Sequence, residues 1–137
     1  MKKIIPLFLI GTAVSSFAQE NSKPNFVLFI ADDCSYYDIG CYGSPDALTP
    51  NIDRFASEGV KFTKGYQAAP MSSPTRHNLY TGLWPVKSGA YPNHTCAYDG
   101  TKSVVHHLKP LGYKVALIGK SHVKPDSVFP FDVYVPD

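Results

Sequence analysis

The strongest chemical signal in the chain is a serine followed four residues later by an arginine, in the segment SSPTR at residues 72–76. Pro74 suits the first turn of a helix, which we predict over residues 74–81 with Gly82 as its end. The N–H groups at a helix N-terminus attract anions, and the spacing places Arg76 on the same face as Ser72. A hydroxyl nucleophile beside a guanidinium suits a tetrahedral oxyanion. On these residues alone, a Ser-Pro helix cap with a surface arginine explains the segment equally well.

Two aspartates, Asp32 and Asp33, follow an apolar run at residues 25–31. The run predicts a strand buried on both faces, in the middle of a parallel sheet. In open α/β sheets, binding sites form beyond the carboxyl ends of strands, where this pair would lie. Adjacent carboxylates repel each other unless a cation neutralises them, and hard oxygen ligands suit calcium or magnesium. A solvated strand end is the alternative interpretation.

Lys120 and His122 follow a second apolar run, at residues 113–119. This run predicts another buried strand. Side chains two positions apart in an extended chain point to the same side. We therefore expect Lys120 and His122 to reach one ligand together.

The elements that must position these residues alternate between strand and helix patterns. Thr49 and Pro50 predict the start of a helix, with Thr49 as its cap and Gly59 as its end. Residues 60–66 predict a short strand, and residues 101–111 predict a further helix. This order of elements indicates an α/β layered fold.

Residues 1–18 have the order of a secretory signal peptide: a basic start at Lys2 and Lys3, an apolar run, and small residues up to Ala18. The domain would then comprise residues 19–137 of a secreted or periplasmic protein. The 137-residue chain has a formal charge of +2, and loss of the two lysines leaves equal numbers of basic and acidic residues. This balance gives no electrostatic reason to expect nucleic acid, or a membrane after signal cleavage, as a partner.

The cysteines do not indicate a metal site. Cys34, Cys41 and Cys96 fit no zinc-binding spacing. Their odd number leaves at least one thiol without an intramolecular partner. The spacing leaves open both a bridge between Cys34 and Cys41 and three reduced thiols.

Three separated motifs together resemble the type I sulfatase family. S-x-P-x-R followed by L-x-T-G resembles its signature, with Thr75 where serine is commoner. The segment PNFVLFIADD at residues 24–33 resembles its first strand and metal-binding aspartate pair. The segment GKSH at residues 119–122 resembles its G-K-x-H element, with Ser121 where the family usually has tryptophan. The resemblance covers residues 23–137.

The resemblance implies an alkaline-phosphatase-like sulfatase fold, a three-layer sandwich with a mostly parallel central sheet. It implies that a serine-type sulfatase-maturating enzyme oxidises Ser72 to formylglycine (3-oxoalanine), whose hydrated form attacks sulfur. Arg76, Lys120 and His122 would complete the catalytic set. The implied metal is Ca²⁺ rather than Mg²⁺, with Asp32, Asp33 and residue 72 as ligands.

The substrate implied by the resemblance is a sulfated carbohydrate carrying sulfate esters or sulfamates. Residues 118–132 resemble the corresponding stretch of the heparan N-sulfatases (sulfamidases). The segment YPNH at residues 91–94 has its histidine where those enzymes carry one near the substrate, so His94 is a candidate substrate-binding residue.

Family members are several hundred residues long, and their remaining site residues come later in the sequence. We therefore expect the 137-residue chain to be an incomplete N-terminal piece, with weak metal binding and little activity alone. Two alternatives remain: a phosphodiesterase or phosphonate hydrolase of the same superfold, and a non-catalytic remnant.

Overall fold

The computed structural model describes residues 23–137, so the predicted signal peptide at residues 1–18 lies outside the described residues. The chain divides into two units, residues 1–30 and 31–137. In the first unit, residues 23–30 form neither helix nor strand. No helix in the described part of the chain is long and apolar enough to cross a membrane.

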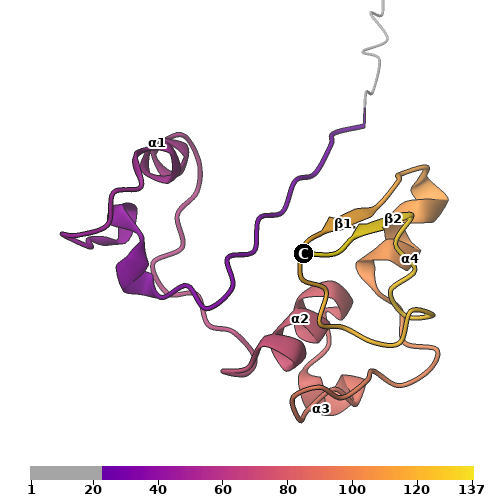
Figure 1. Ribbon diagram of the computed structural model, residues 1–137. Helices are drawn as coiled ribbons and strands as arrows, with labels where there is room; N and C mark the ends of the chain where they lie inside the picture. Colours follow the sequence, from indigo (N-terminus) through magenta and orange to yellow (C-terminus); the bar gives the residue numbers. More distant parts are fainter. Residues whose placement is uncertain (1–22) are drawn as a thin grey trace, which may run out of the picture. The chain divides into compact units, whose positions relative to one another are not determined.

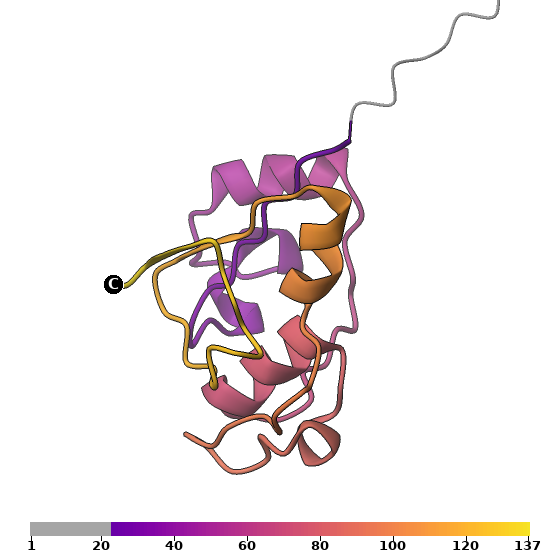
Figure 2. The same ribbon diagram turned by 90° about the vertical axis from the view of Figure 1, so that its right-hand side faces the viewer.

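The second unit contains short helices and a two-stranded parallel sheet (Figures 1 and 2). Its packing brings α2 against α3 and α4. In chain order the elements are 3₁₀ turns at Tyr36–Asp38 and Gly40–Tyr42, α1 (Pro50–Glu58), α2 (Ser72–Thr81), α3 (Pro85–Ser88), α4 (Val104–Leu108), a 3₁₀ turn at Lys109–Leu111, β1 (Ala116–Ile118) and β2 (Val133–Val135).

The sheet pairs β1 with β2 in parallel, with Leu117 opposite Tyr134. The strand predicted over residues 113–119 is therefore confirmed in its centre, but its predicted burial is wrong because Ala116 and Ile118 are exposed. Strand β2 was not predicted from the sequence; it is a run of three residues directly before Pro136. Such a short run carries too little periodicity to predict a strand.

The strands predicted at residues 25–31 and 60–66 were wrong. Both segments lack strand structure, and their side chains are exposed. A strand forms only where a neighbour completes its hydrogen bonds, and a buried strand needs partners on both sides and cover on both faces. Among the described residues, the strand pairing found is that between β1 and β2. Asp32 and Asp33 therefore lie in a turn and not at a strand end.

The helix predicted from Pro50 is confirmed as α1, and it ends before Gly59 as predicted. Capping by Thr49 was wrong, since its side chain makes no cap hydrogen bond. The Thr49 hydroxyl instead accepts a hydrogen bond from the Gly40 N–H and donates to the Asp53 carboxylate. Thr49 thus ties the start of α1 to the preceding 3₁₀ turn.

The helix predicted over residues 101–111 is shorter in the structure. It is α-helical over Val104–Leu108 and continues as the 3₁₀ turn Lys109–Leu111. Pro110 explains the change, because proline lacks the N–H that would continue the α-helical hydrogen bonds. Gly112, in the left-handed region at φ 85°, ends the segment.

A small hydrophobic core lies between α2 and the C-terminal segment. Tyr80 on α2 packs with four buried residues, namely Ala97, Val123, Val128 and Phe129. Leu117 on β1 and Phe131 pack against this cluster. The core therefore fixes α2 relative to the chain that follows β1. These two parts carry Ser72, Arg76, Lys120 and His122.

Candidate functional site

Ser72 is the first residue of α2, where the N–H groups have no acceptors within the helix. The helix begins two residues earlier than predicted, and the preceding Met71 makes no side-chain cap. Pro74 fits in this first turn because its missing N–H would have no helical partner there. The Ser72 side chain thus lies at the positive end of the helix dipole, as the sequence predicted.

Arg76, one turn later, returns over Ser72. Its Nε donates to Ser72 Oγ at 3.2 Å, and its Nη2 pairs with Asp32 Oδ1 at 3.1 Å. Its Nη1 donates to the carbonyl oxygen of Lys120 at 2.8 Å. Since the arginine side chain is only 7% exposed, these acceptors replace the water that its charge would otherwise require. One guanidinium therefore joins three parts of the chain that are distant in sequence.

Asp32 is the point where the site's cations converge. Lys120 Nζ pairs with Asp32 Oδ2, while Arg76 holds Oδ1. Ser72 Oγ lies 3.4 Å from Asp32 Oδ1, a long hydrogen bond. The hydrogen bonds from Lys120 and then Arg76 hold the pKa of the Asp32 carboxyl below its usual range. Lys120 and Arg76 therefore favour the ionised form of Asp32.

His122 and His94 form a second pair. His122 Nε2 lies 2.8 Å from His94 Nδ1, and the two rings lie 4.7 Å apart. His122 Nδ1 is buried and has no hydrogen-bond partner among the described residues. Burial, and then the neighbouring cations His94, Lys120 and Arg76, lower the pKa of His122. These contacts keep the imidazole neutral to lower pH than a solvated histidine.

The expectation that Lys120 and His122 point the same way rested on an extended chain. The structure contradicts that premise, because His122 has a φ of 50° in the left-handed region and the segment is not a strand. The two side chains accordingly contact different partners, Asp32 for Lys120 and His94 for His122.

The predicted metal ligands are brought together only in part. Asp32 and Ser72 are in contact, but Asp33 has a φ of 51°, and no hydrogen bond or ion pair of its side chain is found within residues 23–137. The same residues contain no group of three or more histidine, cysteine or acidic side chains able to hold a metal. The carboxylate and hydroxyl oxygens fit a hard cation such as Ca²⁺ by type, but not by number.

The three cysteines are free thiols, with Cys34 and Cys96 exposed. Of the arrangements that the spacing left open, the structure shows three reduced thiols. Cys34 Sγ contacts the Ser35 carbonyl oxygen at 3.7 Å. No catalytic partner is found beside any of these thiols in the described chain.

One buried histidine escaped sequence analysis. His77 follows Arg76 on α2 and is fully buried. Its Nδ1 lies 2.8 Å from the Ser73 carbonyl oxygen, and its Nε2 contacts the backbone of Lys124. A histidine next to a reactive motif gives no sequence signal that separates packing from chemistry.

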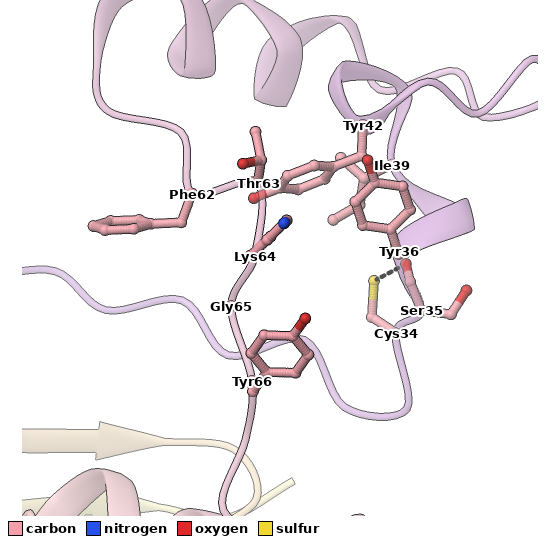
Figure 3. Close-up of a pocket in the computed structure, with 10 residues that line it drawn as sticks. All are labelled: Cys34, Ser35, Tyr36, Ile39, Tyr42, Phe62, Thr63, Lys64, Gly65 and Tyr66. Carbon is pink, nitrogen blue, oxygen red and sulfur yellow. Dashed lines mark hydrogen bonds between the residues drawn. The ribbon is translucent and has the colours of Figure 1, made fainter.

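The structure also contains an open pocket of about 440 Å³ (Figure 3). Its first lining residue, Cys34, directly follows the aspartate pair in the sequence. Four of the pocket's ten lining residues are aromatic, and none of the candidate site residues lines it. The lining residues are Cys34, Ser35, Tyr36, Ile39, Tyr42, Phe62, Thr63, Lys64, Gly65 and Tyr66. The candidate chemistry therefore lies in the surface cluster around Asp32, outside this pocket.

Comparison with known proteins places these residues in a family context. The chain is 45% identical to an ulvan-active sulfatase of Formosa agariphila over 112 residues, which are 82% of this chain and 22% of that protein. It is 39% identical to human steryl-sulfatase, over 89% of this chain and 23% of that protein. It is 36% identical to an N-acetylgalactosamine-6-O-sulfatase of Bacteroides thetaiotaomicron, over 77% and 22% respectively.

A solved structure agrees with the sequence relatives. The crystal structure of yidJ from Bacteroides fragilis, a protein assigned as a sulfatase, matches with a TM-score of 0.55 and 34% identity. The match covers 64% of this chain and 20% of that one. The chain thus spans about a fifth of the length of the relatives it matches. The predicted α/β fold class is confirmed by this neighbour and by the parallel sheet.

The sulfatase family model matches residues 24–133, a range that includes every candidate site residue described above. The relatives described above are themselves named sulfatases, which are sulfuric ester hydrolases. The chain therefore belongs to the sulfatase family.

Proposed function

We propose that the protein hydrolyses sulfate groups on a carbohydrate through a formylglycine made from Ser72. The observation that carries the proposal is the contact set of Ser72. Its hydroxyl lies at the N-terminus of α2, with Arg76 at 3.2 Å and Asp32 at 3.4 Å. Lys120 pairs with the same Asp32. One cation therefore contacts the Ser72 oxygen at a helix N-terminus, and a second pairs with the neighbouring Asp32, an arrangement that favours a tetrahedral oxyanion such as sulfate.

Formylglycine, when formed, would supply a hydrated aldehyde: one hydroxyl attacks sulfur, and the second then expels sulfate and restores the aldehyde. An unmodified serine would instead remain sulfated. Ser72 fits this role because its oxygen is partly buried and held by Arg76 rather than by a backbone cap. Arg76 would orient that oxygen and stabilise negative charge on it. Lys120 would bind the sulfate oxygens as a mobile point charge.

His122 would bind the sulfate or hold a proton for the reacting oxygen. Its lowered pKa keeps the ring neutral and able to accept a proton near neutral pH. His94, which contacts His122, is the proposed substrate-binding residue. We propose Ca²⁺ as the bound metal, with Asp32, Asp33 and residue 72 as ligands that supply hard oxygens. Further ligands from elsewhere would have to complete the shell.

The proposed substrate class is a sulfated carbohydrate. Two of the relatives are named for ulvan and for N-acetylgalactosamine 6-O-sulfate, whereas another is a steryl-sulfatase. From the sequence resemblance of residues 118–132 to the heparan N-sulfatases, we also propose sulfamates as substrates. The proposal includes export by the segment at residues 1–18 to a secreted or periplasmic location. Its proposed partner in maturation is a serine-type sulfatase-maturating enzyme.

The maturation step is the decisive test, because it requires no turnover. The chain would be co-expressed with a serine-type maturase, and the tryptic peptide of residues 65–76 analysed by fragmentation mass spectrometry. We expect residue 72 to lose the mass of two hydrogen atoms and to react with a hydrazide probe. Ser73→Ala should leave this conversion intact, whereas Ser72→Ala should abolish it. An unmodified Ser72, in cells that convert a full-length serine-type sulfatase, would refute the proposal.

A further inference from the structure

The buried His77 links α2 to the segment at residues 120–124. It belongs to α2, which also carries Ser72 and Arg76. Its ring crosses to the segment at residues 120–124, which carries Lys120 and His122. Because the His77 side chain is fully buried, its two ring nitrogens can form hydrogen bonds only with protein partners.

The hydrogen-bond partners of the ring favour one position for its proton. Nδ1 lies 2.8 Å from the Ser73 carbonyl oxygen and 3.4 Å from Ser73 Oγ, and Nε2 lies 3.0 Å from the Lys124 carbonyl oxygen, so each nitrogen faces an acceptor. Nε2 also faces a backbone donor, the Lys124 N–H at 3.2 Å, whereas the donor beside Nδ1 is the more distant Ser73 hydroxyl. A proton on Nδ1 therefore gives each nitrogen a partner at the shorter distances.

Arg76 and His77 therefore hold the same segment at its two ends. Arg76 Nη1 donates to the Lys120 carbonyl at 2.8 Å, and His77 Nε2 accepts from the Lys124 N–H. The ring also packs edge to face against Phe129, with centroids 5.2 Å apart. Two neighbouring residues of one helix thus hold both ends of the segment at residues 120–124, in which His122 has an uncommon left-handed conformation.

We propose that His77 is a positioning residue, which holds the segment at residues 120–124 against α2 through its Nδ1–H tautomer. It sets the placement of Lys120 and His122 relative to Ser72 without itself contacting substrate. The importance of that placement rests on the proposed sulfatase function. The hydrogen bonds themselves can be tested whether or not Ser72 is converted.

The test uses the chain described here, with His77→Gln, His77→Asn and His77→Phe. The amide of glutamine reaches the position of Nε2, whereas that of asparagine reaches only the position of Nδ1. We expect amide hydrogen exchange at Lys124 to rise about tenfold in His77→Asn and His77→Phe, and less in His77→Gln. Ring and amide chemical shifts of His122 and Lys120 should move in the same order. His107→Gln, an exposed histidine on α4, should change neither.

Global destabilisation is separated from this effect by the Gly119 N–H, which bonds to the Val135 carbonyl in the sheet. Its exchange should change less than that of Lys124 in every His77 variant. Nitrogen-15 spectra of the wild-type ring should show a protonated Nδ1 and an unprotonated Nε2. A proton on Nε2 alone, or equal Lys124 exchange in the glutamine and asparagine variants, would overturn the proposal. Failure of Ser72 conversion would instead count against the sulfatase function only.

Discussion

At the scale of single residues, Arg76 determines how the site is assembled. Its three nitrogens reach Ser72 Oγ, the Asp32 carboxylate and the Lys120 carbonyl oxygen. The planar fork of arginine can meet several acceptors in fixed directions, which a lysine ammonium cannot reproduce. The arginine is thus a structural requirement of the site as well as a charge.

Arg76→Lys should therefore destabilise the chain although it keeps the charge. We expect a loss of roughly 1–3 kcal/mol in the free energy of unfolding, because a buried side chain loses at least one charged hydrogen bond. Urea denaturation followed by circular dichroism measures it. The matched control is Arg54→Lys on the exposed surface of α1, which should change stability little. Equal effects of the two substitutions would contradict this account of Arg76.

The pKa of His122 is a second residue-scale prediction. Burial and the cations around it lower this pKa from the ordinary 6.5. The unfolded chain then binds the proton more readily than the folded one, so the contribution of His122 to stability is complete above pH 6.5 and is lost as the pH falls through the lowered folded value. Proton NMR titration, with His122→Asn to assign the signal, measures the midpoint. His94→Gln should raise it towards 6.5, because one of the neighbouring cations is removed.

The sequence predicted the spacing of Ser72 and Arg76 on one helix better than it predicted the contacts between distant segments. Ser72 and Arg76 could be placed from helix spacing alone, because a helix fixes residues one turn apart. Contacts of Asp32 with Arg76 and Lys120 join positions separated by more than forty residues, so no local pattern specifies them. His94 and His122 likewise meet through loops with positive φ angles, which residue type does not dictate.

At the scale of elements, the register of the sheet depends on a side chain outside both strands. Asp132 Oδ2 accepts from the Val115 N–H, and the Asp132 N–H donates to the Val115 carbonyl, both at 2.8 Å. Lys109, at the end of α4, pairs with Asp132 Oδ1 at 2.9 Å. The Val115 hydrogen bond first, and then Lys109, lower the pKa of Asp132. Asp132 thus starts the pairing that Ala116 and Val133 continue.

Asp132→Ala should loosen the pairing of β1 with β2. We expect faster amide exchange at Gly119, whose N–H bonds to Val135 at the far end of the sheet. Lowering the pH through the lowered pKa of Asp132 should have the same effect in the wild type. Protonation removes the negative charge that strengthens the hydrogen bond from Val115 and the ion pair with Lys109. Lys109→Met, which removes only the ion pair, should cause a smaller change. An unchanged Gly119 exchange rate in Asp132→Ala would argue against this role.

Elements that carry their own boundary signals were predictable, whereas those that depend on neighbours were not. The start of α1 follows from Pro50, and the end of α2 from Gly82 in the left-handed region. The apolar runs at residues 25–31 and 60–66 have the composition of buried strands but no strand partner among the described residues. The composition of a segment indicates that it can form a strand, but a strand forms only where another segment of the chain pairs with it.

At the scale of the whole molecule, buried and exposed apolar residues are out of balance. The core cluster consists of five buried residues. By contrast, Phe62 and Tyr66 are 73% and 90% exposed, and Leu48 and Phe55 are 93% and 78% exposed. Phe62 and Tyr66 also line the open aromatic pocket (Figure 3). Exposed apolar clusters of this kind bind apolar probes and promote self-association.

We therefore expect the chain to bind the dye ANS in its folded state, and its light scattering to rise with concentration. Phe62→Ser with Tyr66→Ser should lower dye binding without lowering stability, because neither side chain is buried. Val128→Ala should do the reverse: it removes fully buried methyl groups from the core at a cost of about 2 kcal/mol, and leaves the pocket intact. If the double serine variant binds as much dye as the wild type, the dye binds to a loosely packed core and not to Phe62 and Tyr66. The exposed aromatic surface would then not be the cause of association.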